Sequence, residues 1–157
     1  LRRPGQPPTR LLVAPGRPAQ AVRRHLDDGT GHGPLSIVWR PHCSQTEFDE
    51  VLWASDANWV RGEDSLVRAL WAGKPLVWHI YPQDDGAHHA KLRAFLDMLQ
   101  APPDQRAFHE AWNAYRPLPL PGSDPLDWAP AARAARVRLL DQADLLSQLV
   151  GFVTKIQ

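Results

Sequence analysis

Short apolar runs alternate with segments of helical periodicity along the first half of the chain. The apolar runs predict strands at 11–14, 35–39, 57–60 and 75–81. Between them, apolar side chains recur at roughly helical spacing, which predicts helices at 19–26, 45–54 and 65–72. Strands that alternate with helices in this way favour a parallel sheet with helices on both faces. The predicted fold class is therefore α/β.

The second half of the chain is predicted to be helical. Helices are expected at 87–99 and 105–115, followed by a proline-rich break at 117–125 that fixes the crossing between helices. From about residue 130 to 156 the pattern predicts one long helix or two, with an apolar stripe of Leu139, Ala143, Leu146, Val150 and Val153. This stripe indicates packing in the core, or packing against a domain that is not part of the sequence.

The length of the chain is typical of one domain. With 157 residues, 43% apolar content and seven tryptophans, it can bury one real core. We expect a single domain over residues 1–157, with a C-terminal helical segment at 127–157. Residues 1–10 are rich in proline, arginine and glycine, as a linker is. A linker at the start of a sequence that begins with Leu1 rather than methionine predicts the downstream part of a longer protein.

Charge and hydropathy exclude two classes of partner. Eighteen basic and seventeen acidic residues leave a formal net charge of +1, so the electrostatic attraction that drives nonspecific nucleic-acid binding is absent. No apolar run is long enough to span a bilayer, and the first residues lack the pattern of a signal peptide. The single cysteine, Cys43, cannot form an internal disulfide and fits a reducing compartment. We therefore expect a cytoplasmic protein with no nucleic-acid or membrane partner.

The segment Arg-Gly-Glu-Asp-Ser at 61–65 lies between a predicted strand and a predicted helix. In open parallel sheets, ligands bind outside the carboxyl ends of the strands, and the start of a following helix favours a phosphate. Arg61 can pair with two phosphate oxygens, Gly62 lets the backbone approach closely, and Ser65 offers a hydroxyl and an N–H. A structural interpretation stays open, in which the polar residues only start the helix and Arg61 pairs with Glu63.

Two other groups of residues are candidates for a metal site and for a catalytic thiol. His88 and His89, near Asp84 and Asp85, are adjacent on a predicted helix and point roughly 100° apart, so they do not converge on a metal as residues at i and i+4 would. We expect no metal site. Cys43 with the histidine before it is a weak candidate for a thiol enzyme, because sequence neighbours seldom place a base correctly against a nucleophile.

The run from Phe48 to Gln83, FDEVLWASDANWVRGEDSLVRALWAGKPLVWHIYPQ, resembles the bacterial protein-arginine rhamnosyltransferases that modify translation elongation factor P. VRGEDS, the WAGKP turn and the HIYPQ strand end follow the order and spacing of that family. The resemblance implies a GT-B glycosyltransferase, in which two Rossmann-like halves face each other across a cleft. This chain resembles the C-terminal half, with a helical C-terminal extension. In the family that half binds thymidine diphosphate rhamnose (dTDP-rhamnose), and the sugar moves to an arginine with inversion and without a metal or other cofactor.

The resemblance also implies roles for single residues. Phe48, which by its helical position fits core packing as well as base stacking, would stack on the thymine, with Gln45 on or beside the base. Arg61 and Ser65 would hold the diphosphate, and Tyr81 and Gln83, at the end of the next strand, could reach the sugar. The expected nucleotide-sugar-binding residues are Gln45, Phe48, Arg61, Glu63, Asp64, Ser65 and Gln83. Glu63 and Asp64 match the acidic pair of the family and are also the candidate catalytic residues.

The other half of the family's enzymes, with the aspartate thought to act as general base, is absent from this sequence. Attack at the anomeric carbon needs a neutral guanidine nitrogen, so a carboxylate near the acceptor must deprotonate the guanidinium. The expected partners are therefore dTDP-rhamnose, elongation factor P and the missing N-terminal half, and the chain alone is expected to be inactive. The alternatives are a noncatalytic nucleotide-binding or protein-interaction module, and a structural helical domain that would leave residues 61–65 unexplained.

Overall fold

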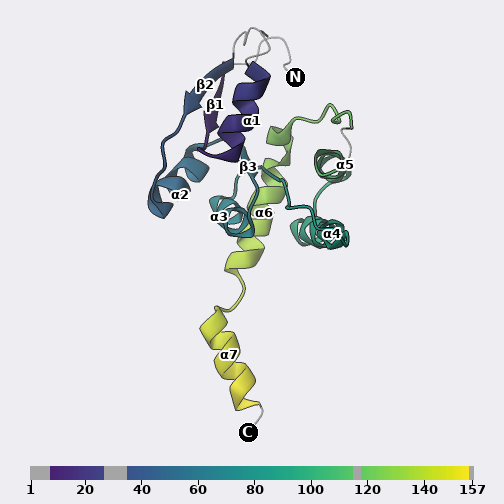
Figure 1. Ribbon diagram of the computed structural model, residues 1–157. Helices are drawn as coiled ribbons and strands as arrows, with labels where there is room; N and C mark the ends of the chain where they lie inside the picture. Colours follow the sequence, from purple (N-terminus) through teal and green to yellow (C-terminus); the bar gives the residue numbers. More distant parts are fainter. Residues whose placement is uncertain (1–7, 27–34, 115–117, 156–157) are drawn as a thin grey trace. The chain divides into compact units, whose positions relative to one another are not determined.

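The computed structural model describes residues 8–26, 35–114 and 118–155. It contains two compact units, residues 1–47 and 48–157. The first unit is a β–α–β segment of β1 (Thr9–Val13), α1 (Arg17–Leu26) and β2 (Leu35–Trp39) (Figure 1). β1 and β2 pair in parallel, with Leu11 opposite Ile37. The expectation of a single domain over residues 1–157 stays a prediction.

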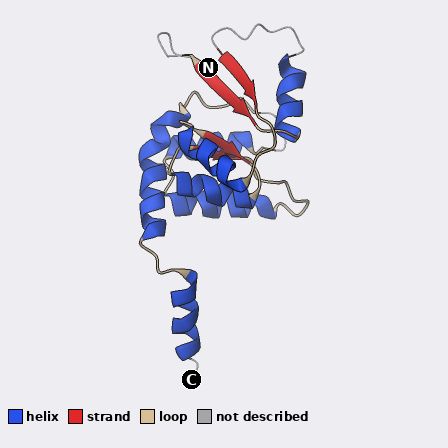
Figure 2. Cartoon of the chain, turned by 90° about the vertical axis from the view of Figure 1, so that its left-hand side faces the viewer, coloured by secondary structure: helices blue, strands red, loops and turns tan. Residues whose placement is uncertain are grey.

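One helix runs from the first unit into the second. This helix, α2 (Gln45–Ala54), begins with a capping box in which Ser44 and Glu47 satisfy each other's main-chain N–H groups. The remaining elements of the second unit are β3 (Asn58–Val60), α3 (Glu63–Ala72), β4 (Leu76–Trp78), α4 (Ala87–Leu99), α5 (Pro103–Trp112), the 3₁₀ helix η1 (Pro125–Trp128), α6 (Ala129–Leu140) and α7 (Leu145–Thr154). β3 and β4 pair in parallel, with Val60 opposite Trp78 (Figure 2).

The core of the second unit covers both faces of β4. Leu76 and Trp78 belong to a cluster with buried side chains of α2, α3, α4 and α6, whereas Val77 packs with Phe108 and Trp128 in a second cluster. Side chains of a strand point alternately to opposite faces, so these two clusters lie on opposite sides of β4. A strand buried on both faces reads as a continuous apolar run, which is why this element was visible in the sequence. The predicted α/β class, with parallel strands and alternating helices, is confirmed.

Several predicted boundaries are wrong. α5 begins at Pro103 and ends at Trp112 rather than at residues 105 and 115, and α1 begins at Arg17 rather than at residue 19. β1 begins at Thr9, so part of the expected linker at 1–10 is a strand; residues 1–7 lie outside the described residues. β4 ends at Trp78 rather than at residue 81, because its partner strand β3 is only three residues long and ends at Val60. α3 begins at Glu63 rather than at Ser65, since acidic residues are well accommodated in a first helical turn.

The C-terminal segment forms two helices, α6 and α7, which is one of the two predicted alternatives. The carboxylate of Asp144 accepts a hydrogen bond from the Ser147 N–H at 3.0 Å and caps the start of α7. No residue of α7 that the structure describes is buried, and Leu146, Val150 and Val153 are exposed. Core packing of the apolar stripe is therefore wrong for α7. Among the described residues, no helix combines the length and the hydropathy that are needed to cross a membrane.

Candidate functional site

The predicted turn joins β3 to α3. Arg61 follows the last residue of β3, and Gly62 is the N-cap of α3 in an extended conformation with φ −70° and ψ 154°. No side chain caps this helix in the part of the chain that the structure describes, and the first helical hydrogen bond runs from the Leu66 N–H to the Gly62 carbonyl at 2.9 Å. The N–H groups of the three residues between them have no partner inside the helix. Together with the positive end of the helix dipole, they can bind an anion.

Within the described residues, Arg61 contacts an aromatic ring and forms no ion pair with a carboxylate. Its guanidinium carbon lies 4.6 Å from the centroid of the Tyr81 ring, a cation–π contact. The Arg61 Nε atom is buried, and within the described residues it has no hydrogen-bond partner. The structural interpretation in which Arg61 pairs with Glu63 is not found among the described ion pairs. Burial and the nearby charge of Arg61 lower the pKa of His79. An unpaired guanidinium beside a helix start is suited to an anionic ligand.

The two acidic residues of the turn differ in their contacts. Asp64 is 81% exposed and accepts a hydrogen bond of 3.3 Å from Arg68, one helical turn later. Arg68 also donates two hydrogen bonds, of 3.0 and 2.8 Å, to the carboxylate of Asp49 on α2, and these bonds raise the Arg68 pKa. Glu63 is exposed and Ser65 is half-buried, both in the first turn of α3. Asp64 is therefore part of an ion-pair network on the helix surface.

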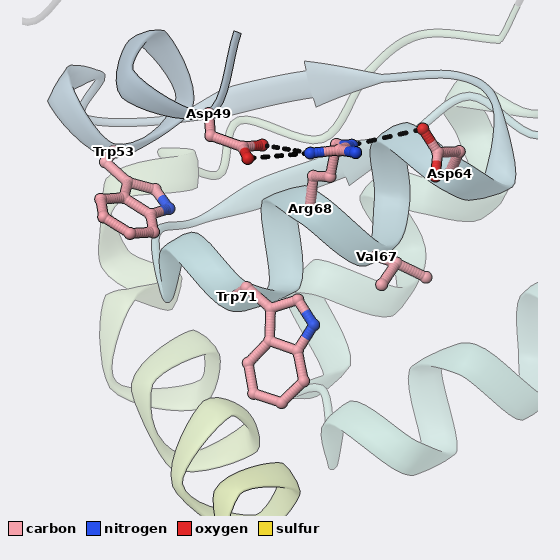
Figure 3. A pocket seen from close by; sticks show the side chains of 6 residues that line it. All are labelled: Asp49, Trp53, Asp64, Val67, Arg68 and Trp71. Atoms are coloured by element: carbon pink, nitrogen blue, oxygen red, sulfur yellow. Dashed lines mark hydrogen bonds and ion pairs between the residues drawn. The ribbon is translucent and has the colours of Figure 1, made fainter. Parts of the chain in front are cut away.

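The network lies in a shallow surface pocket of about 270 Å³. Figure 3 shows Arg68 between the two aspartates, with the rings of Trp53 and Trp71 beside it. Sequence reasoning missed Asp49 and Arg68. The spacing of Asp64 and Arg68 was visible as an i, i+4 pair, but nothing in the sequence linked Arg68 to a residue nineteen positions earlier.

The proposed base-contacting residues lie on α2. Phe48 is half-buried and packs against the core of the second unit, so the structure supports its packing role. Gln45 is exposed at the first residue of the helix. Because the two residues are three positions apart on one helix, their side chains lie on neighbouring parts of its surface.

The strand end after β4 contributes an aromatic face. Tyr81 is 46% exposed and stacks on Arg61, and its ring also lies close to Gly62. Gln83 is exposed, and its main-chain N–H donates a hydrogen bond to Nδ1 of the buried His88 at 3.0 Å. The turn at 61–65 and the residue Tyr81 are thus brought together, while the contacts described for Gln83 belong to its backbone.

The described residues support neither a metal site at His88 and His89 nor a thiol enzyme built on Cys43. The rings of His88 and His89 lie 4.1 Å apart, closer than their helical positions suggested, and His88 is engaged with the Gln83 backbone. Within the described ranges, no group of three or more metal-ligating side chains is placed to hold a metal ion. Asp85 accepts a hydrogen bond from the Ala87 N–H at the start of α4. Cys43 is an exposed free thiol.

Three comparisons place the chain among known proteins. The profile of the family described as "Elongation-Factor P (EF-P) rhamnosyltransferase EarP" matches residues 2–154. A protein-arginine rhamnosyltransferase of Pseudomonas aeruginosa is 42% identical over 125 residues, which cover 71% of this chain and 33% of that protein. A protein-arginine rhamnosyltransferase of Shewanella oneidensis is 36% identical over 141 residues, which cover 78% of this chain and 34% of the relative. The chain thus spans about a third of the length of these relatives.

A solved structure has the same fold. It is described as the structural basis for EarP-mediated arginine glycosylation of translation elongation factor EF-P, and it matches with a TM-score of 0.71 at 31% sequence identity. The match covers 97% of this chain and 54% of the solved chain. The arrangement of parallel strands and helices described above is therefore shared with that protein.

Proposed function

Because the chain belongs to the EarP family of elongation factor P rhamnosyltransferases, we propose that it is the donor-binding half of such an enzyme. In this proposal the chain has the fold of the C-terminal half of a GT-B glycosyltransferase and binds dTDP-rhamnose. The acceptor is an arginine side chain of elongation factor P. The part of the solved relative that this chain does not cover would correspond to the other half of the enzyme, which supplies the general base.

The observation that supports this proposal most strongly is that Arg61 lies directly before the uncapped start of α3. A diphosphate needs several hydrogen-bond donors that converge on its oxygens. The Arg61 side chain, whose Nε atom is buried without a partner in the described residues, lies next to a helix start that no side chain caps. Ser65, in the first turn of α3, adds a hydroxyl to these donors. No metal is required, because the guanidinium and the helix N-terminus compensate the charge of the diphosphate.

The remaining site residues receive roles that fit their positions. Phe48, half-buried on α2, stacks on the thymine, with Gln45 beside the base. Glu63 is exposed in the first turn of α3 and accepts hydrogen bonds from donor or acceptor groups. Asp64 is held by Arg68 and positions the reacting groups from the same turn. Gln83 contacts the sugar.

In the proposed transfer reaction, this half of the enzyme stabilises the leaving group. A guanidine nitrogen of the acceptor forms a bond to the anomeric carbon of rhamnose, and the bond from that carbon to the diphosphate oxygen breaks with inversion. Negative charge develops on the leaving thymidine diphosphate. Donors that are already in place around the diphosphate stabilise this charge without reorganisation. The proton of the guanidinium goes to a base outside this chain, so donor binding and turnover are separable.

Calorimetric titration with thymidine diphosphate tests donor binding. Arg61→Ala should weaken binding by about tenfold to a hundredfold, the loss expected for hydrogen bonds to a charged group. Phe48→Ala should weaken it by a similar factor through loss of base stacking. Arg133→Ala serves as the matched control, because it removes the same charge from an exposed position on α6. Unchanged heats for both Arg61→Ala and Phe48→Ala would refute the donor site.

Mass spectrometry of elongation factor P tests turnover. With dTDP-rhamnose present, the chain alone should leave the mass of elongation factor P unchanged, because the general base is missing. Efficient addition of one rhamnosyl group by the chain alone would contradict the proposal that the general base belongs to the other half of the enzyme.

A further inference from the structure

Trp78 links the end of β4 to the turn that carries Arg61. The indole Nε1–H of Trp78 donates a hydrogen bond of 2.8 Å to the main-chain carbonyl of Arg61. The main-chain pairing of the two strands ends just before this point, with the His79 N–H bonded to the Val60 carbonyl at 2.8 Å. The first carbonyl after β3 is therefore bound by a side chain, at the position where the chain turns into α3.

The Trp78 side chain is itself fixed by its surroundings. It is 4% exposed, and its ring meets the ring of Phe95 edge to face, with centroids 5.3 Å apart. Aromatic pairs of this geometry add directional packing to the burial of apolar surface. The indole N–H thus points to the Arg61 carbonyl from a rigid position.

Helix α5 holds the main chain of Trp78 from the edge of β4 opposite β3. The Trp78 N–H donates to Nε2 of His109 at 3.3 Å, and the Trp78 carbonyl accepts from the Asn113 amide at 2.9 Å. The same amide side chain accepts a hydrogen bond from the Ile80 N–H at 3.0 Å. His109 lies on α5, and Asn113, four positions later, is the C-cap residue of this helix, so both side chains lie on the same side of it. Their side chains provide the partners that a neighbouring strand would otherwise provide.

We propose that Trp78 is a positioning residue for the anion-binding turn. Its indole N–H fixes the Arg61 carbonyl, and through it the direction in which the chain enters α3. As a result, the Arg61 guanidinium and the first N–H groups of α3 are presented together to the diphosphate. The role rests on the proposed function, since it gives the turn a ligand, but the hydrogen bond and its effect on the turn do not depend on donor binding.

Trp78→Phe is the informative variant, because phenylalanine keeps an aromatic ring in the core and removes the indole N–H. Trp128→Phe is its matched control. Trp128 is 1% exposed, and its indole N–H donates a partly buried hydrogen bond of 2.8 Å to Asp104, so the control loses an indole bond of the same length and similar burial. Both variants should lower thermal stability. Only Trp78→Phe should alter the turn at 61–65.

Two measurements distinguish positioning from a general loss of stability. In calorimetric titrations at a temperature where all variants are folded, Trp78→Phe should bind thymidine diphosphate about threefold to tenfold more weakly than the unmodified chain. Trp128→Phe should bind as the unmodified chain does. Binding of thymidine, which lacks the diphosphate, should be unchanged in both variants. Equal diphosphate affinity in the unmodified chain and Trp78→Phe would overturn the proposal.

Hydrogen–deuterium exchange without ligand provides the second measurement. Trp78→Phe should speed exchange of the Leu66 amide, which bonds to the Gly62 carbonyl and closes the first turn of α3, whereas Trp128→Phe should leave it unchanged. If the unmodified chain binds no thymidine diphosphate, the proposed function fails, and exchange at this turn then decides the Trp78 proposal by itself. Unchanged exchange of the Leu66 amide in Trp78→Phe refutes it.

Discussion

Replacing Asn113 by alanine removes the side chain that joins α5 to the end of β4. The Asn113 amide accepts a hydrogen bond from the Ile80 N–H and donates to the carbonyls of Trp78 and His109, at 3.0, 2.9 and 2.8 Å. The His109 carbonyl keeps a second partner, the main-chain N–H of residue 113. The substitution therefore takes away the side-chain partner of two main-chain groups, one on Ile80 and one on Trp78.

The expected loss of stability follows from these two groups. Ile80 and Trp78 are each 4% exposed, so water cannot readily replace the lost hydrogen bonds. A buried polar group without a partner costs about 1–3 kcal/mol, so two such groups should lower the free energy of unfolding by about 3 kcal/mol. This is a large share of the roughly 5–15 kcal/mol that stabilises a typical domain.

Urea unfolding followed by circular dichroism measures this loss, and Asn58→Ala provides the control. Asn58 is 5% exposed, and its side chain donates a single hydrogen bond of 3.0 Å to the Leu52 carbonyl. One lost bond should lower the free energy of unfolding by about 1.5 kcal/mol. The reasoning is refuted if Asn113→Ala destabilises the chain no more than Asn58→Ala does.

Two further predictions concern His109 and the start of α2. Burial lowers the pKa of His109, although its hydrogen bond to Gln105 partly opposes this. The unfolded chain therefore takes up a proton first, and the free energy of unfolding should fall as the pH drops below about 6.5. Across that pH range, the urea midpoint should decrease less for His109→Gln than for the unmodified chain. An equal decrease would show that protonation of His109 is not the cause of the pH dependence. Ser44→Ala should lower the free energy of unfolding in urea by about 1 kcal/mol, because it removes the hydroxyl that accepts from the Glu47 N–H in the capping box of α2. It should also raise the pKa of Glu47, which hydrogen bonds from Ser44 now lower, and a proton titration followed by NMR that shows no rise would contradict this.

Much of the fold was predictable because its elements carry strong local patterns. β2, α2 and α4 begin and end where the sequence predicted, since apolar periodicity and adjacent turn residues mark both ends. The end of β4 was not predictable. The apolar pattern continues through Ile80, but the last main-chain bond to β3 is made by the His79 N–H, and the Ile80 N–H bonds to the Asn113 side chain instead of to a strand.

The candidate site, too, was only partly predictable from the sequence. Arg61 and the start of α3 were predictable, because a polar turn between a strand and a helix is a local feature of the sequence. Trp78 was read only as a strand residue, since its partner Arg61 lies seventeen positions earlier. His109 and Asn113 are separated from β4 by more than thirty positions and carry no motif. Contacts of this kind arise from tertiary packing, which a single sequence does not display.

The most direct test of the central claim is an NMR titration of the chain with thymidine diphosphate. If the turn binds the diphosphate, the largest amide shift changes should occur at Glu63, Asp64 and Ser65, at the start of α3, and Arg61→Ala should strongly reduce them at equal ligand concentration. Shift changes confined to other parts of the chain, or changes at the turn that Arg61→Ala leaves intact, would contradict the account.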